Sequence, residues 1–306
     1  MPIADLTDVR MHYEVYGTGQ PVVLIPGLGV TSEIWRTSAD FLSESFSVIC
    51  PDNRGIGRSS AKRQPRTVRD YSADLLELFD HLQLERAHVM GLSLGGVIAQ
   101  CFAVEHPDRI HRLVIVAATH DFTPYLREMS RLVGHTLHWF PKSMFERTFE
   151  ILGAGPPCFD ANPGRIDERI LLTRKMGVPA RAIGRQMHAL ASSRFDPNEF
   201  HIAAPTLALS GQFDSLIPSC YVRKTAALIR DSRFILIPDA GHNPFIDRPD
   251  FVLPLIHAFL TGSEIANDRA ERETSQSSAL PPRGNAWGSP GRRLSWAGSR
   301  DGVRGG

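Results

Sequence analysis

A serine lies between two glycines in the pentapeptide Gly91-Leu-Ser-Leu-Gly95, and Gly96 follows directly. The apolar run 87–90 before it predicts a buried strand, and the run 97–104 after it predicts a helix. A serine on a tight turn between a strand and a helix exposes its hydroxyl at the edge of a sheet, and glycines are needed where side chains would collide with neighbouring elements. Ser93 is therefore a candidate nucleophile. The alternative is a Gly-rich turn in which the serine only caps the helix.

A serine hydroxyl is a poor nucleophile unless a base takes its proton and an acid orients that base. Asp214 comes shortly after the predicted strand 206–209, and His242 comes shortly after the predicted strand 234–237. Taken alone, the first could be a turn or helix-cap aspartate and the second a surface histidine. Their chain order, serine then aspartate then histidine, and their places at strand ends favour a catalytic set. Asp121, which also follows a predicted strand, is a rival for the orienting acid.

Acyl transfer also needs hydrogen-bond donors for the oxyanion that develops on the carbonyl. One expected donor is the backbone N–H of Leu94, the residue after the serine. The other is expected from the loop Pro26-Gly-Leu-Gly29 after the predicted strand 22–25, with Leu28 as the best candidate. Read alone, this loop is also compatible with an ordinary Gly/Pro turn. Such a site calls for no metal and no organic cofactor, so none is predicted.

Short apolar runs predict the buried strands that must position these residues: 22–25, 48–50, 87–90, 113–116, 206–209 and 234–237. Amphipathic patterns lie between several of them. The clearest begins at Thr67, where Asp70 three residues later predicts an N-terminal cap. Alternating strands and helices predict a mostly parallel sheet flanked by helices. Residues 9–16 alternate in polarity and predict an antiparallel arm before that sheet.

Only helical patterns occur between residues 121 and 200, with a Gly/Pro-rich connection at 153–164. We expect this segment to be a helical lid over the C-terminal edge of the sheet, where open α/β sheets hold their sites. The core is then formed by residues 1–120 and 201–262. Residues 274–306 contain almost no aliphatic side chains, and we expect residues 263–306 to be a disordered tail.

Aromatic side chains of the predicted lid are candidates for substrate binding, namely Trp139, Phe140 and Phe145. They would form an apolar pocket for an acyl or alcohol group, or else the lid's own core. Several arginines in the same segment could receive a carboxylate-bearing substrate, or lie on solvated helix faces. The substrate stays open on the sequence alone.

Composition excludes several classes of protein. The 306 residues carry a formal net charge of +1, which argues against partners such as nucleic acid or an anionic membrane surface. Neither an apolar run long enough to cross a bilayer nor a signal sequence is evident, so we expect a cytoplasmic protein. Four cysteines without a Cys-x-x-Cys pair predict neither a zinc site nor a disulfide framework. The oligomeric state is not predicted.

These motifs, in this order, resemble the α/β-hydrolase superfamily over residues 1–262, and the run 91–100 is most similar to small serine carboxylesterases and enol-lactonases. The stretch Pro51-Asp-Asn-Arg-Gly-Ile-Gly-Arg-Ser59 resembles the family's D-x-R-G-x-G-x-S loop, which implies a structural role for Asp52 and Arg54. The oxyanion loop departs from the common His-Gly pattern of the family, but its donors are backbone groups, so catalysis need not suffer.

The resemblance implies an α/β-hydrolase fold with a helical lid inserted after the sixth strand, and a triad of Ser93, Asp214 and His242. The predicted activity is hydrolysis of a small-molecule carboxylic ester or lactone through an acyl-enzyme. A serine in this position argues against the haloalkane dehalogenases and epoxide hydrolases, which use an aspartate nucleophile. Two alternatives stay open: a C–C bond hydrolase of a vinylogous diketone, and a hydrolase-fold ligand-binding protein with little turnover.

Overall fold

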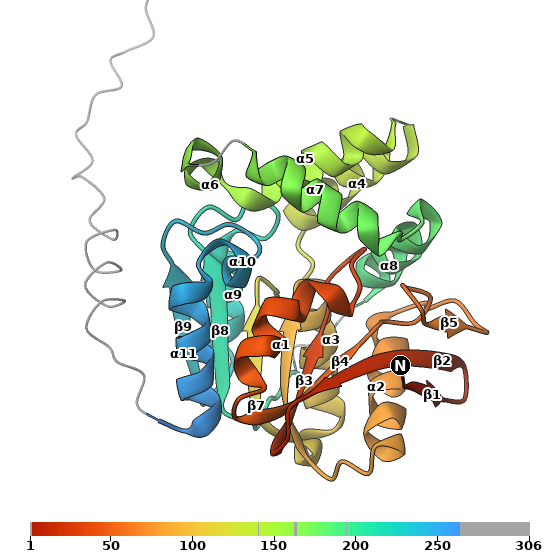
Figure 1. Ribbon diagram of the computed structural model, residues 1–306, viewed down its shortest axis with the longest axis vertical. Coiled ribbons are helices and arrows are strands. Elements are labelled where there is room, and N and C mark those ends of the chain that lie inside the picture. Colours follow the sequence, from red (N-terminus) through yellow and green to blue (C-terminus); the bar gives the residue numbers. More distant parts are fainter. Residues whose placement is uncertain (1, 140, 162–163, 194, 197, 264–306) are drawn as a thin grey trace, which may run out of the picture.

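The computed structural model describes residues 2–139, 141–161, 164–193, 195–196 and 198–263. Within these ranges nine strands form one sheet in the order β1-β2-β4-β3-β6-β7-β8-β9, with β5 paired to β2 (Figure 1). Strand β2 is antiparallel to its neighbours, and every pair from β4 across to β9 is parallel. The predicted mostly parallel sheet with an antiparallel arm is confirmed.

The strands are β1 Ile3–Asp5, β2 Val9–Tyr16, β3 Gln20–Ile25, β4 Phe46–Pro51, β5 Ser60–Ala61, β6 Ala87–Leu92, β7 Ile110–Val116, β8 Thr206–Gly211 and β9 Ser232–Ile237. The α-helices are α1 Arg36–Leu42, α2 Val68–His81, α3 Leu94–Glu105, α4 Pro124–Trp139, α5 Lys142–Ala154, α6 Pro156–Ala161, α7 Arg165–Met176, α8 Ala180–Ser192, α9 Ser219–Ala227, α10 Pro244–Asp247 and α11 Pro249–Thr261. Short 3₁₀ turns are Ser32–Trp35 and Pro107–Arg109. The predicted tail, 263–306, lies outside the described residues except for its first position.

Successive side chains of the central strands fill two different cores, one on each face of the sheet. Val23 and Ile25 of β3 pack with α2 and α3, whereas Val22 and Leu24 pack with α1 and α11. Because successive side chains of a strand point to opposite faces, a strand buried on both faces must be apolar throughout. This explains why continuous apolar runs, rather than alternating ones, identify the parallel strands in the sequence.

The cap predicted for the helix after Thr67 is confirmed. The Thr67 side chain accepts a hydrogen bond from the Arg69 N–H, and the Asp70 carboxylate accepts one from the Thr67 N–H. Helix α2 therefore starts at Val68 with its first backbone donors satisfied. Helix α2 packs on α3, which begins directly after the candidate nucleophile Ser93, and so helps to hold α3 in place.

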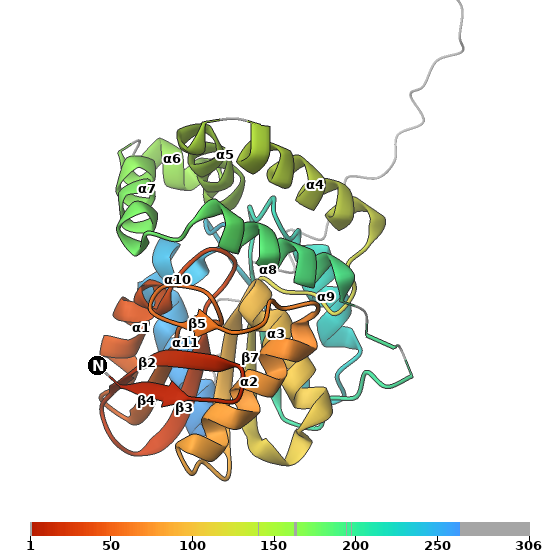
Figure 2. The same ribbon diagram turned by 90° about the vertical axis from the view of Figure 1, so that its right-hand side faces the viewer.

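Helices α4 to α8 lie between β7 and β8 in the chain and together cover one end of the sheet, at the top in Figures 1 and 2. Two expectations need correction. The connection predicted at 153–164 contains helix α6, whose prolines stand in its first turn, where a missing N–H costs nothing. The helices follow the seventh strand in chain order rather than the sixth that the resemblance implies, because the short strands β1 and β5 both count in that order. The division into core and lid stays a prediction.

A search of the described residues finds no helix both long enough and apolar enough to span a bilayer.

His88 of β6 makes stability depend on pH. Its side chain is 2% exposed, and within the described part of the chain neither ring nitrogen has a hydrogen-bond partner. The ring packs edge-on against Phe46 and lies near His111. Burial, with a smaller contribution from His111, lowers the pKa of His88 to about 4. The folded state therefore disfavours the charged imidazolium.

We expect the free energy of unfolding to fall by about 2–3 kcal/mol through this group as pH drops from 6.5 towards 4. The unfolded chain binds the proton near its ordinary pKa while the folded chain resists it, so stability is complete above pH 6.5 and lost below. Urea unfolding of wild type and His88→Leu at pH 7 and pH 4.5 measures this. Equal pH dependence in the two proteins would contradict the assignment.

Candidate active site

Ser93 sits on the sharp turn between β6 and α3. Its backbone has φ 52° and ψ −117°, a combination that non-glycine residues rarely adopt. The Ser93 N–H donates to the carbonyl of Val116 on the neighbouring strand, at 2.8 Å, which helps to hold the strained turn. The hydroxyl makes no capping hydrogen bond to α3. The helix-cap alternative therefore does not describe this serine, whose side chain stays available for other contacts.

The three glycines around Ser93 are required by close packing. A Cβ on Gly91 would collide with the carbonyl of Gly95, and a Cβ on Gly95 would collide with the carbonyl of Ile25. At Gly96 it would lie 2.5 Å from the Cβ of Ala118. The glycine pattern thus reflects how tightly the turn is pressed between β3, β6 and the segment after β7.

His242 and Asp214 form a buried pair. The His242 Nδ1 lies 2.8 Å from the Asp214 Oδ2, and the two residues are 4% and 5% exposed. The other carboxylate oxygen, Asp214 Oδ1, accepts the backbone N–H groups of Leu216 and Ile217, each at 2.9 Å. These amides lock the carboxylate in one orientation, so it fixes the imidazole ring that it faces.

The rival acid lies elsewhere. Asp121 is exposed, and its N–H contacts the hydroxyl of Thr119 at 3.3 Å. The structure thus places Asp214, not Asp121, against the ring of His242.

The two residues expected to donate to an oxyanion lie on different elements. Leu94 is the first residue of α3 and Leu28 lies on the loop after β3. In the part of the chain that the structure describes, neither backbone N–H has an acceptor within the protein. The loop is held at both ends by buried amide side chains: Asn53 Nδ2 donates to the Pro26 carbonyl at 3.0 Å, and Gln186 Oε1 accepts the Gly29 N–H at 2.8 Å.

Gln186, which the sequence analysis did not single out, is expected to position the Leu28 loop through its hydrogen bond with Gly29. Replacing it with Met keeps the side-chain length but removes the acceptor for Gly29, which should let the Leu28 N–H swing out of line. We expect kcat to fall about tenfold with a smaller change in KM, because a misplaced donor weakens transition-state stabilisation most. Steady-state kinetics of Gln186→Met and Gln186→Glu test this, since glutamate retains an acceptor. A Met variant with unchanged kcat would contradict the positioning role.

A cavity of about 60 Å³ joins the candidate residues. Ser93, His242 and Leu28 line it together with Ser130 and a mostly apolar wall formed by Phe122, Leu126, Met129, Val133, Phe149, Met187, Leu190, Leu216 and Ile217. Three residues of that wall, Leu126, Met129 and Val133, recur at helical spacing along α4, and this spacing is a signal that the sequence contains. Among the described residues, no cluster of three His, Cys, Asp or Glu side chains is placed to hold a metal ion.

The three aromatic residues expected to bind substrate differ in where the structure places them. Trp139 is 75% exposed at the end of α4, which argues against its expected place in a substrate pocket. Phe145 lines a second, adjoining cavity, which shares Leu28 and Phe149 with the first. Phe140 lies outside the described residues.

Helices α5 and α7 contact the loops that carry Asp214 and His242. The Leu152 carbonyl accepts the Ser215 N–H at 3.3 Å, and the Gly153 carbonyl accepts the His242 N–H at 2.5 Å. On α7, buried Arg169 pairs with Asp247 at 2.8 Å, and the other oxygen of Asp247 accepts the Gly241 N–H at 2.9 Å. The covering helices therefore form part of the support for the histidine loop.

The loop that resembles D-x-R-G-x-G-x-S has the structural contacts expected of it. The carboxylate of Asp52 accepts the N–H of Ser32 at 2.8 Å and that of Arg58 at 3.1 Å. The guanidinium of Arg54 makes a bidentate pair with Asp74 of α2. Burial raises the pKa of Asp74 to about 6, against the opposing effect of the arginine. These contacts tie the loop to the turn before α1 and to α2.

Comparison with known proteins agrees with this fold. Residues 20–153 match the family model described as the alpha/beta hydrolase fold. The chain is 28% identical over 83% of its length to the pimeloyl-[acyl-carrier protein] methyl ester esterase of Edwardsiella ictaluri, covering 99% of that protein. It is 27% identical over 82% of its length to a protein of Caulobacter sp. (strain K31) provisionally named carbamate hydrolase RutD, covering 96% of it. The crystal structure of a thermophilic esterase from Thermogutta terrifontis superposes with a TM-score of 0.73 and 28% identity, covering 86% of this chain and 99% of that one.

The chain has the α/β-hydrolase fold, and its residues 20–153 match the model of that family. Its relatives include an esterase and a protein assigned to carbamate hydrolysis, so the class of enzyme they support is a hydrolase.

Proposed function

We propose that the protein is a serine hydrolase that cleaves a carboxylic ester or lactone of a small molecule, with Ser93, Asp214 and His242 as its triad. The observation that carries the proposal is the buried Asp214–His242 pair, in which the histidine shares a cavity with a serine on a strained turn. An imidazole fixed in this way can accept the proton of an attacking hydroxyl.

In the proposed reaction, His242 takes the proton from Ser93 as its Oγ attacks the carbonyl carbon. The N–H groups of Leu28 and Leu94 bind the resulting oxyanion, and such a donor typically contributes about 3 kcal/mol. The protonated histidine gives its proton to the leaving alcohol, and water then attacks the acyl-serine by the same route. Asp214 keeps the imidazole in the required tautomer and stabilises its charged form.

The apolar wall of the cavity supports an apolar group next to the scissile carbonyl, and helices α4 to α8 are proposed to act as a lid over it. A second candidate function is carbamate hydrolysis, which the name of the Caulobacter relative favours and the same triad could perform. The expectations of a cytoplasmic location, and of no nucleic-acid or membrane partner, stay predictions.

The direct test is reaction of the full chain with a fluorophosphonate, which phosphonylates activated serines whatever the natural substrate. We expect one equivalent to attach at Ser93, located by peptide mass, together with turnover of p-nitrophenyl esters. Turnover of a matched p-nitrophenyl carbamate that exceeds ester turnover would favour the second candidate. A protein that neither reacts with the probe nor turns over any ester would contradict the proposal.

A further inference from the structure

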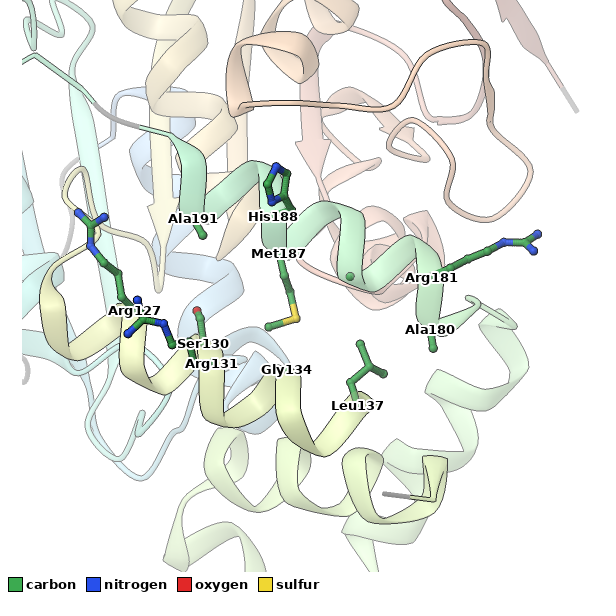
Figure 3. Close-up of a pocket in the computed structure, with 11 residues that line it drawn as sticks. Arg127, Ser130, Arg131, Gly134, Leu137, Ala180, Arg181, Met187, His188 and Ala191 are labelled. Carbon is green, nitrogen blue, oxygen red and sulfur yellow. The ribbon is translucent and has the colours of Figure 1, made fainter. Parts of the chain in front are cut away.

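Helices α4 and α8 lie side by side and enclose a groove of about 660 Å³ (Figure 3). Met187 points from α8 toward α4, and Leu137 points from α4 toward α8, so the middle of the groove is apolar. Gly134 provides room for this packing, since a Cβ there would lie 3.4 Å from the terminal methyl of Met187. This groove between α4 and α8 is distinct from the cavity at Ser93 and from the adjoining cavity lined by Phe145.

The ends of the groove are positively charged. Three arginines line it, Arg127 and Arg131 on α4 and Arg181 on α8, and no acidic residue is among its lining residues in the described chain. Arg131 pairs with Glu128, whereas Arg127 and Arg181 have no carboxylate within 4.0 Å in the part of the chain that the structure describes. Guanidinium groups without a carboxylate partner beside an apolar groove attract anions, and a carboxylate can accept two parallel N–H hydrogen bonds from one of them.

The groove adjoins the catalytic cavity. Ser130 and Met187 line both spaces, so the two spaces adjoin at these side chains. The cavity at Ser93 measures about 60 Å³, far below the roughly 300–1,000 Å³ of a site that encloses a whole organic ligand. A substrate larger than a few atoms must therefore extend out of it, and methionine is a side chain that adapts readily to a neighbour.

We infer that the substrate is an ester that carries a carboxylate at the end remote from the scissile carbonyl, joined to it by an apolar chain. The carbonyl occupies the small cavity, the chain passes Met187, and the carboxylate meets Arg127 or Arg181. This inference rests on the proposed function, because it names the substrate class of the same site.

The experiment compares esters matched in length and differing only in the remote charge. The first pair, p-nitrophenyl hydrogen suberate and p-nitrophenyl octanoate, places the carboxylate on the acyl side. The second pair, 8-acetoxyoctanoate and octyl acetate, places it on the alcohol side. We expect the anionic ester of one pair to have a kcat/KM about tenfold higher than its neutral partner, and the preference to shrink in high salt because exposed charges are screened.

Arginine variants locate that preference. Arg127→Gln and Arg181→Gln should each lower the anionic-to-neutral ratio of kcat/KM about threefold, and the double variant should bring it close to one. Arg185→Gln is the matched control, because this arginine lies one turn from Arg181 on α8, is exposed, and does not line the groove. It should leave the ratio unchanged.

The outcomes separate the two proposals. Equal kcat/KM within both pairs, or a preference that the Arg127 and Arg181 variants leave intact, would overturn the inference while ester hydrolysis stands. A wild-type protein that cleaves none of the four esters and does not react with a fluorophosphonate would instead remove the proposed function itself.

Discussion

Ser93→Ala should lower kcat on an activated ester by about 10⁵-fold or more, and it should abolish labelling by a fluorophosphonate. Without the hydroxyl no acyl-enzyme can form, and the residual rate reflects only binding and the oxyanion donors. The fold should survive, because the side chain makes no capping hydrogen bond to α3. Single-turnover and steady-state assays of wild type and variant at equal concentration measure the loss.

Ser130→Ala is the matched control for this experiment. Ser130 lines the same cavity but follows no strand and sits on helix α4 rather than on a strained turn. We expect the kcat of Ser130→Ala to fall by less than tenfold. If Ser93→Ala kept a tenth of the wild-type rate while Ser130→Ala lost most of it, the assignment of the nucleophile would be wrong.

Asp214→Asn should lower kcat by about 10⁴-fold with little change in thermal stability. The amide nitrogen can donate but cannot accept, so an asparagine in this place favours the imidazole tautomer that lacks a lone pair toward the serine. The carboxylate oxygen that accepts the Leu216 and Ile217 N–H groups is replaced by an amide oxygen that can still do so. Kinetics together with melting curves separate the catalytic loss from any structural one.

Asp121→Asn provides the comparison, because Asp121 is the other aspartate that follows a strand at this edge of the sheet. Asp121 is exposed, and its backbone N–H and carbonyl contact the hydroxyl of Thr119. We expect its kcat to stay within about twofold of wild type, as for most surface substitutions. A large loss at Asp121 with a small one at Asp214 would reverse the assignment of the acid.

Features that depend on a few consecutive residues could be predicted from the sequence. The turn at Ser93 is such a feature, because its glycines are required by packing against β3 and β6 that any sequence with this turn must satisfy. The cap at Thr67 is another. The Asp214–His242 pair was predictable for a different reason: carboxyl ends of parallel strands meet at one edge, so two residues that follow adjacent strands come close together.

Features that depend on how helices pack could not be predicted. The exposure of Trp139 follows from which face of α4 meets the core, and aromatic character alone does not specify that face. The contact between Gln186 and the Gly29 N–H joins residues 157 positions apart, and a glutamine on a helix is ordinarily a surface residue. Helix α6 begins with two prolines, which in sequence indicate a loop as readily as the first turn of a helix.

The backbone N–H groups of Ser215 and His242 donate to carbonyls at the end of α5, and these contacts limit how the covering helices can be altered. A shortened chain that joined β7 directly to β8 would remove the acceptors of both backbone N–H groups, along with the Arg169 partner of Asp247. His242, the proposed base, would then lie on a loop without these contacts. Transplanting the covering helices from a relative would accordingly require the end of α5 and the histidine loop to be transferred together as one unit.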